Sequence, residues 1–260
     1  MLSTTHPNDH DVSAQVEAVA RLIAESKHLV AFTGAGISTD SGIPDFRGPD
    51  GVWTRRDAGL PPPAWGTPQA KVRPNASHEA LVELQELGRL KFLITQNTDN
   101  LHRRSGIRPE LLAELHGNGR LMRCTECDRQ FERSEVGWDR ELFGPGYRTQ
   151  KPVKGQPPCP RCRGRLVSSV VNFGDLLPER ELALAALHAQ RCDVMLALGS
   201  SLVVNPAAAL VGLALEHGAH VVLINRGETP YDELVGTRIE AGIGTILPAA
   251  AARAKALLGR

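Results

Sequence analysis

Four of the five cysteines in this 260-residue chain form two Cys-x-x-Cys pairs, Cys124 with Cys127 and Cys159 with Cys162. Each pair can present two thiolates from one tight turn, and two such turns make the tetrahedral sulfur cage that suits zinc. The 31 residues between the pairs (128–158) exceed what a compact zinc ribbon needs, so they must form an excursion of their own. The sequence therefore predicts one structural zinc ion per chain, bound in a small module.

Two disulfides, or unrelated buried thiols, are the competing interpretations of these cysteines. We expect no signal peptide, because residues 1–11 are polar, and a cytosol keeps thiols reduced. A redox Cys-x-x-Cys usually occurs once, near a strand-to-helix junction, and not twice in a loop-rich segment. Cys192 stands alone in an apolar run and is expected in the core. These features favour zinc.

The composition, 42% hydrophobic and 23% charged, suits one sizeable α/β domain with an inserted lobe. No apolar run is long enough to span a membrane, so we expect a cytoplasmic protein with no membrane partner. Net charge is +1, yet residues 120–165 carry eleven Lys and Arg against six Asp and Glu. An acidic partner or nucleic acid could use this excess, but solvated surface charge is the simpler explanation, so nucleic acid is not required.

Short apolar runs alternate with helical patterns along most of the chain. An amphipathic helix is predicted over Ser13–His28, with Ser13 as its N-cap, followed by a strand over Leu29–Phe32. Further strands are predicted at Lys91–Thr95, Val167–Val171, Val194–Leu198 and His220–Ile224, and helices at Ser77–Leu87, Pro178–Gln190, Pro206–His217 and Pro248–Leu258. This alternation predicts an α/β fold with a parallel sheet covered on both faces.

Four predicted strand ends are followed by polar or glycine-rich residues: Gly34–Gly36, Gln96–Asp99, Gly199–Ser201 and Asn225–Gly227. In open parallel sheets, ligands collect beyond the carboxyl ends of the strands, and glycines let the backbone approach a pyrophosphate. Thr39 stands where Gly-x-Gly-x-x-Gly would have its third glycine, which argues against a standard dehydrogenase half-domain. Ordinary turns would explain any one of these segments, but four at one sheet edge indicate a nucleotide site.

Two further features fall outside the alternating pattern. The segment Gly42–Gly48 places an aromatic ring, a carboxylate and a guanidinium in an irregular stretch that could close over a cofactor or simply shape a surface turn. His116 falls where the α/β pattern gives way to the cysteine-bearing segment. Most isolated histidines are structural, but an imidazole that titrates near neutral pH is a natural general base for a hydroxyl.

Taken in order, these motifs resemble the sirtuins, the NAD-dependent protein deacylases, over roughly residues 15–260. The resemblance rests on the paired cysteines and on Gly34-Ala35-Gly36-Ile37-Ser38, Gly42-Ile43-Pro44-Asp45-Phe46-Arg47-Gly48, Thr95-Gln96-Asn97-Thr98-Asp99, Leu115-His116-Gly117-Asn118, Val171-Asn172-Phe173-Gly174-Asp175 and Gly199-Ser200-Ser201-Leu202. It implies a Rossmann-like NAD-binding domain (13–40, 76–115 and 166–260), a cofactor-binding loop and small-lobe insertion (41–75) and a zinc-binding module (116–165).

The resemblance also implies roles for individual residues. His116 and Asn97 would be catalytic. Cofactor contacts would come from Gly34, Ala35, Gly36, Thr39, Ile43, Asp45, Phe46, Arg47, Gln96, Asn97, Asp99, Gly199, Ser200, Ser201, Asn225, Arg226 and Ile243. Val171, Phe173 and Gly174, with His116, would bind an acyl-lysine peptide that pairs as an extra strand.

The chemistry implied by the resemblance consumes NAD as a co-substrate. The acyl oxygen attacks the nicotinamide ribose as nicotinamide leaves, and His116 then deprotonates a ribose hydroxyl. The products are lysine, nicotinamide and O-acyl-ADP-ribose, which makes the enzyme both an acyl transferase and a hydrolase. Zinc would be structural, because four thiolates leave no position for water.

Departures from the family pattern leave the acyl preference open. Thr98 and Asn100 differ from the usual residues of the nicotinamide motif, and Asn172 and Asp175 differ in the substrate segment. The stretch from Gly48 to Thr54 is similar to a sirtuin branch with weak deacetylase, long-chain deacylase and mono-ADP-ribosyltransferase activities, whereas Gly227–Asp232 is similar to bacterial deacetylases. A deacetylase is the first expectation, and the alternatives are a long-chain deacylase, a mono-ADP-ribosyltransferase and a nucleic-acid-binding zinc module.

Overall fold

The structure, a computed structural model, describes residues 7–64, 66–67 and 71–259. The chain forms two compact units, each with its own sheet. The larger unit comprises the residues up to Thr95, Leu101–Ala113 and the residues from Ala183 onward. The smaller unit comprises Gln96–Asn100 and Glu114–Leu182.

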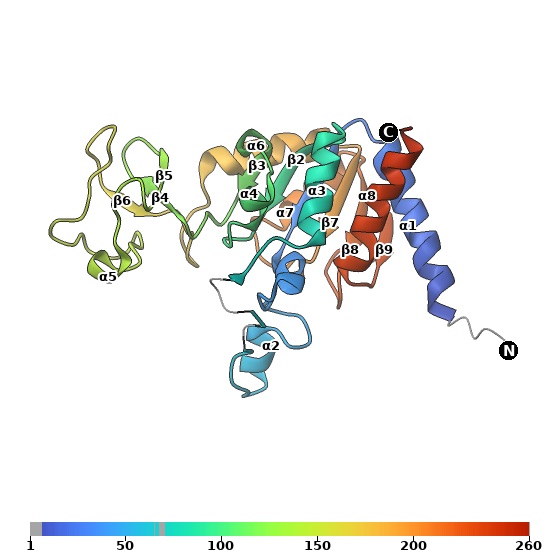
Figure 1. The fold of residues 1–260 in the computed structure, drawn as a ribbon, viewed down its shortest axis with the longest axis horizontal. Helices are drawn as coiled ribbons and strands as arrows, with labels where there is room; N and C mark the ends of the chain where they lie inside the picture. The colour runs from blue at the N-terminus through green and yellow to red at the C-terminus, as the bar shows by residue number, and fades with distance from the viewer. Residues whose placement is uncertain (1–6, 65, 68–70, 260) are drawn as a thin grey trace. The chain divides into compact units, whose positions relative to one another are not determined.

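A six-stranded sheet with the order β3-β2-β1-β7-β8-β9 forms the centre of the α/β fold (Figure 1). Its strands are β1 (Leu29–Thr33), β2 (Leu90–Thr95), β3 (Leu112–Glu114), β7 (Val194–Leu198), β8 (His220–Ile224) and β9 (Thr237–Ile239). The pairs β1–β2, β1–β7, β7–β8 and β8–β9 run parallel. All residues of β1 and β7 are buried, as their continuous apolar runs predict for strands covered on both faces.

The register of the sheet brings four strand ends level with one another. Thr33 is opposite Thr95 and Leu198, and Leu198 is opposite Ile224. The segments that follow these strands therefore leave the sheet at the same edge, as the sequence predicts.

Three helices pack together on one face of this sheet. Helix α8 (Ile243–Leu257) lies between α1 (Pro7–Glu25) and α3 (Ala76–Glu86) in Figure 1 and contacts both. Their apolar sides meet strand residues such as Leu93 and Val222 in one core cluster. Two further helices of the fold are α6 (Glu179–Arg191) and α7 (Ala209–Glu216), and α7 contacts β7 and β8. None of the helices in the described ranges is long and apolar enough to cross a membrane.

Short helical segments occupy the connections of both units. They are η1 (Ala35–Ser41), α2 (Val52–Asp57), α4 (Leu101–Ser105), η3 (Pro109–Leu111) and, in the smaller unit, α5 (Arg140–Phe143). The smaller unit also contains an antiparallel sheet with the order β5-β4-β6, from β4 (Leu121–Cys124), β5 (Gln130–Glu132) and β6 (Leu166–Ser168). Met122, Trp138 and Leu166 form its core with Cys124 and Cys159.

The predicted elements differ from the observed ones in four places, and the first is α7, which begins at Ala209 and not at Pro206. Helix α1 begins at Pro7, so Ser13 lies inside it and is not its N-cap. The predicted strand Val167–Val171 is shorter, and as β6 it pairs antiparallel with β4 of the smaller sheet because the turns of the cysteine module bring these two segments together. Helix α8 begins at Ile243 and not at Pro248, which lies inside it. The strands β7 and β8 match the prediction residue for residue, and Cys192 is buried as predicted.

Candidate active site and metal centre

The turns after β1 and β7 touch through their backbones. The amide of Gly34 donates to the Leu198 carbonyl at 3.0 Å, and that of Gly36 donates to the Gly199 carbonyl at 2.8 Å. A Cβ at Gly34 would lie 2.6 Å from the Gly199 oxygen, and a Cβ at Gly36 would lie 2.7 Å from the Gly199 Cα. These turns therefore require glycine for their close approach, which accounts for the glycines that sequence alone assigned to a nucleotide.

The loop after η1 is shaped by its own side chains. Asp45 Oδ1 accepts from the Gly48 amide at 2.9 Å, and the Arg47 guanidinium lies 4.5 Å from the centre of the Trp53 ring. The rings of Phe46 and Trp53 are 5.0 Å apart and tilted by 46°, while Phe46 remains 47% exposed. Trp53 received no role from sequence reasoning, yet it supports two predicted cofactor residues and leaves Phe46 accessible to a ligand.

An arginine that sequence reasoning missed fixes the turn after β8. Arg238 donates from Nη1 to the Asn225 carbonyl at 2.9 Å and from Nη2 to the Gly227 carbonyl at 2.8 Å. Its Nε donates to Asp232 Oδ1 at 3.1 Å, which holds the guanidinium in place. No local pattern pointed to Arg238, because Asn225 and Gly227 are 13 and 11 residues away and are reached only when β9 pairs with β8.

The predicted site residues fall into two sets, one in each compact unit. The larger unit contains Gly34, Ala35, Gly36, Thr39, Ile43, Asp45, Phe46, Arg47, Gly199, Ser200, Ser201, Asn225, Arg226 and Ile243. The smaller unit contains Gln96, Asn97, Asp99, His116, Val171, Phe173 and Gly174, together with the four paired cysteines.

His116 is oriented by the segment that follows β2. Its Nδ1 lies 3.0 Å from the Gln96 carbonyl oxygen. A carbonyl can only accept, so Nδ1 carries the proton of the neutral ring and Nε2 presents a lone pair. Burial lowers the pKa of His116 from its ordinary value, and the hydrogen bond to Gln96 acts in the opposite direction. The ring is therefore neutral at pH 7 and can accept a proton at Nε2.

Asn118 ties the Gln96–Asn100 segment to the rest of the smaller unit. It is fully buried, and its Nδ2 donates to Asn100 Oδ1 at 2.8 Å and to Glu114 Oε1 at 2.6 Å. The Gly119 amide donates to the Thr98 carbonyl at 2.9 Å. Asp99 is thus held between Thr98 and Asn100, the positions that Gly119 and Asn118 fix, and Asn97 directly precedes Thr98. Asn118 belongs to a motif that the sequence singled out, but its positioning role was not predicted.

The predicted substrate segment is attached directly to the predicted base. The Val171 amide donates to the His116 carbonyl at 3.0 Å. A Cβ on Gly117 would lie 1.9 Å from the Ser169 oxygen, so only glycine allows this approach. Asp175 Oδ2 accepts from the Asn172 amide at 3.2 Å and closes a turn that leaves Phe173 83% exposed. The structure therefore brings His116 and the substrate segment together.

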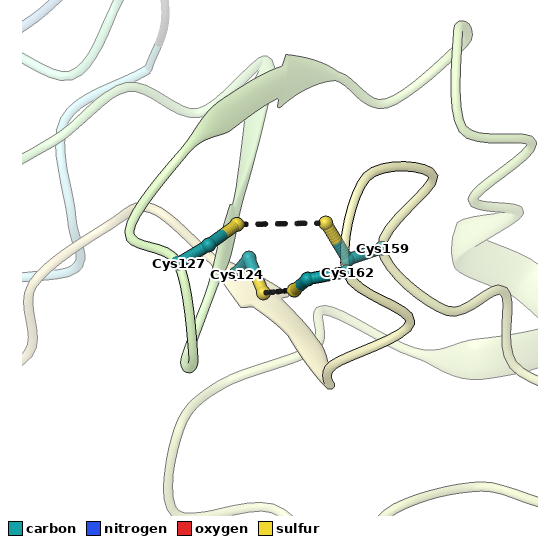
Figure 2. Close-up of side chains that lie close together, drawn as sticks. All are labelled: Cys124, Cys127, Cys159 and Cys162. Carbon is teal, nitrogen blue, oxygen red and sulfur yellow. Dashed lines mark hydrogen bonds between the residues drawn. The ribbon is translucent and has the colours of Figure 1, made fainter.

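The four paired cysteines converge on one point (Figure 2). The Sγ atoms of Cys124 and Cys162 are 3.4 Å apart, those of Cys127 and Cys159 are 3.7 Å apart, and all four lie within 4.8 Å of one another. Zn–S bonds of about 2.3 Å in a tetrahedron place sulfurs about 3.8 Å apart, so the cluster fits zinc. Burial opposes ionisation of Cys159, but the amides of Cys162 and Arg161 donate to it, and its pKa is lowered to about 7.

The fold and these sites define an α/β protein with a nucleotide-type sheet edge and a four-cysteine metal module. The model of the Sir2 family matches residues 34–60 and 64–206. The chain belongs to the Sir2 family.

Known relatives of the chain include a plant protein and a bacterial protein. The chain is 42% identical over 219 residues to NAD-dependent protein deacetylase SRT1 of Oryza sativa subsp. indica, a match that covers 84% of this chain and 44% of the relative. It is 37% identical over 254 residues to NAD-dependent protein deacetylase 1 of Bradyrhizobium diazoefficiens, covering 91% of this chain and 95% of the relative. The chain therefore spans less than half the length of the rice relative and nearly the whole of the bacterial one.

Solved structures share the fold. The structure of Sir2Af2 bound to a myristoylated histone peptide is similar to this chain with a TM-score of 0.66 and 32% sequence identity. The match covers 95% of this chain and 99% of that structure.

Proposed function

We propose that this chain is an NAD-dependent protein-lysine deacylase that transfers the acyl group of a lysine to ADP-ribose and releases nicotinamide. The observation that carries the proposal is the neutral His116 ring, whose Nδ1 is fixed by the Gln96 carbonyl and whose Nε2 is a proton acceptor. The names of relatives that match 84% and 91% of this chain support the same activity. Deacetylation is the first expectation.

NAD supplies the nicotinamide ribose as the electrophile when it is bound, and the residues of this chain supply position and one base. The glycine turns at Gly34 and Gly199 would let the phosphates approach the backbone closely. Asn97 and Asp99 would hold the nicotinamide. His116 Nε2 takes a proton from a ribose hydroxyl, which then attacks the activated acyl carbon.

The acyl-lysine peptide binds along Val171, Phe173 and Gly174, beside the imidazole. Support for this placement comes from the hydrogen bond between Val171 and His116 and from the exposure of Phe173. The ribose oxygen would bond to the acyl carbon first, and water would then complete the release of lysine and O-acyl-ADP-ribose, so the acyl group ends on ADP-ribose. The cytoplasm is the proposed compartment, because a reducing environment keeps the four thiols available to zinc.

A long-chain deacylase is the second candidate. Its support is the similarity of the chain to a Sir2 protein bound to a myristoylated peptide. A panel of lysine peptides that carry acyl groups from acetyl to myristoyl, assayed for nicotinamide release and for O-acyl-ADP-ribose, ranks the two candidates.

The same panel tests the proposed base. His116→Ala should lower kcat/KM about 10²- to 10⁴-fold, the usual contribution of a positioned general base. His217→Ala is the matched control, because His217 is exposed and belongs to neither set of site residues. Unchanged turnover in His116→Ala would refute the assignment. Label from NAD that stays on protein, with no O-acyl-ADP-ribose formed, would identify a mono-ADP-ribosyltransferase.

A further inference from the structure

The positive charge of the cysteine module is confined to one loop. Residues 120–141 carry five arginines and six carboxylates. The connection from α5 to β6, residues 144–165, here called the basic loop, carries six cations and no carboxylate. These cations are Arg148, Lys151, Lys154, Arg161, Arg163 and Arg165.

Most cations of the basic loop are exposed and form no ion pair within the described part of the chain. All except Arg165 are exposed. None of the six forms an ion pair with a residue that the structure describes. Arg148 lines a pocket with Asp128, Asp175 and Glu179 but pairs with none of them, so these cations can still meet an external anion.

Other groups hold the loop in shape, so the exposed cations are not needed for its fold. Gln150 Oε1 accepts from the Gly146 amide at 3.1 Å, and its Nε2 donates to the Phe143 carbonyl at 3.3 Å. Arg165 donates to the Gln150 carbonyl, and Gln156 Oε1 accepts from the Val153 amide at 2.9 Å. The loop therefore presents its charges from a preorganised backbone.

A bound zinc centre would account for only some of the cations in the basic loop. A zinc ion with four thiolates carries two net negative charges, which Arg161 and Arg163 can offset because they flank the Cys159 and Cys162 turn. Arg148, Lys151 and Lys154 lie outside both cysteine turns. These three cations need another explanation.

The composition of the basic loop indicates whether its partner is an acidic protein or a nucleic acid. Protein interfaces have a core of aromatic and apolar residues, whereas nucleic-acid interfaces are polar and strongly positive. Within the basic loop, Tyr147 is the one large apolar side chain that is exposed, at 38%.

We propose that the basic loop is a sequence-independent binding surface for nucleic acid, with Arg148, Lys151 and Lys154 contacting phosphates. This activity is separate from the proposed deacylation.

The test measures binding of a fluorescein-labelled DNA duplex of mixed sequence by anisotropy at increasing NaCl concentrations. Neutralising about three phosphates gives a slope of log affinity against log salt of about −2.7. The triple variant Arg148→Glu, Lys151→Glu and Lys154→Glu should lose this slope and bind about tenfold or more weakly. Lys27→Glu, Lys71→Glu and Lys91→Glu form the matched control, because they change the net charge equally at exposed positions elsewhere.

Zinc content and turnover of a free acyl-lysine peptide report whether each variant is folded. If the triple variant fails to retain zinc, Lys151→Gln with Lys154→Gln replaces it, and the salt slope should then fall by about two. Equal weakening in the loop variant and the control would overturn the proposal, since net charge alone would then explain binding. Salt-sensitive binding of poly-glutamate with no binding of the duplex would also overturn it and point to an acidic protein.

Discussion

The two compact units position their site residues by different means. In the larger unit, the turns at Gly34 and Gly199 meet through backbone hydrogen bonds, and the absence of side chains makes the contact possible. In the smaller unit, the buried side chain of Asn118 holds the segment around Asn97 and Asp99 through Asn100 and Glu114. The first arrangement depends on steric room, and the second depends on satisfied buried polar groups.

Loss of a zinc ligand should produce the largest difference between the two units, because the predicted zinc site belongs to the smaller unit alone. Cys162→Ser removes one thiolate, and structural zinc sites contribute about 10–16 kcal/mol of apparent binding free energy to folding. We expect zinc stoichiometry and deacylase turnover to be lost together, because the small core around Met122, Trp138 and Leu166 includes two of the ligands. Zinc analysis and the thermal unfolding curve provide the measurement.

Cys192→Ala is the control for this change. Cys192 is buried in the larger unit and lies outside the cluster of four. It should retain one zinc per chain with modest destabilisation. Full zinc content and full activity in Cys162→Ser would contradict a four-thiolate structural site.

A single methyl group tests the steric arrangement. Gly36→Ala places a Cβ 2.7 Å from the Gly199 Cα, a backbone atom that cannot move aside cheaply. Overpacking of this kind costs about 1–3 kcal/mol, and the displaced turn should raise the KM for NAD more than it lowers kcat. Gly66→Ala is the control, since its nearest atom would lie at an ordinary 3.6 Å. An unchanged KM would show that the β1 turn does not bind the cofactor.

The polar arrangement is tested by Asn118→Ala. The substitution leaves Glu114 without the Asn118 donor in a buried position, which costs about 1–3 kcal/mol. It also frees the Asn100 side chain, so nicotinamide inhibition and release should change as Asn97 and Asp99 lose their fixed positions. Urea unfolding and nicotinamide inhibition of turnover measure the two effects. Loss of stability with unchanged inhibition would restrict Asn118 to a structural role.

The contrast explains what the sequence could predict. Glycines at strand ends and paired cysteines can be recognised from short sequence motifs, because each acts through its own backbone or its own sulfur atom. The parallel sheet was likewise predictable from the apolar runs that became β1, β2, β7 and β8. Arg238 and Trp53 were not predictable, since their roles depend on partners that only the folded chain brings near.

The prediction of a strand at Val167–Val171 in the parallel sheet was wrong for a related reason. Its apolar pattern is compatible with either sheet, and its pairing with β4 is decided by the turns of the cysteine module and not by its own residues. Short strands such as β3 and β9 carry too few residues for a periodic pattern. Local pattern predicts what a segment can form, and tertiary contacts decide where it pairs.

The smallest predicted effect concerns a buried histidine of the larger unit that neither arrangement uses. His102 Nε2 lies 2.9 Å from Thr33 Oγ1, which donates to Thr95 Oγ1, so this ring joins the ends of β1 and β2. Burial, and then the neighbouring His78, lower the pKa of His102 well below its ordinary value. The folded protein therefore keeps this ring neutral, whereas the unfolded chain binds a proton below about pH 6.5.

The sign of the resulting pH dependence follows from linkage. Below about pH 6.5 the unfolded state binds more protons than the folded state, so the free energy of unfolding falls as the pH falls, by up to about 1.4 kcal/mol per pH unit from this one group. Urea unfolding of the wild type and His102→Gln between neutral and mildly acidic pH measures the difference in slope. His28, His116 and His188 also have lowered pKa values and contribute equally to both proteins, so the comparison reports His102 together with its contact to His78. Identical slopes of the unfolding free energy against pH would mean that the folded protein can protonate His102. The β1 and β2 ends would then be held together by the glycine contacts and not by a neutral, buried His102.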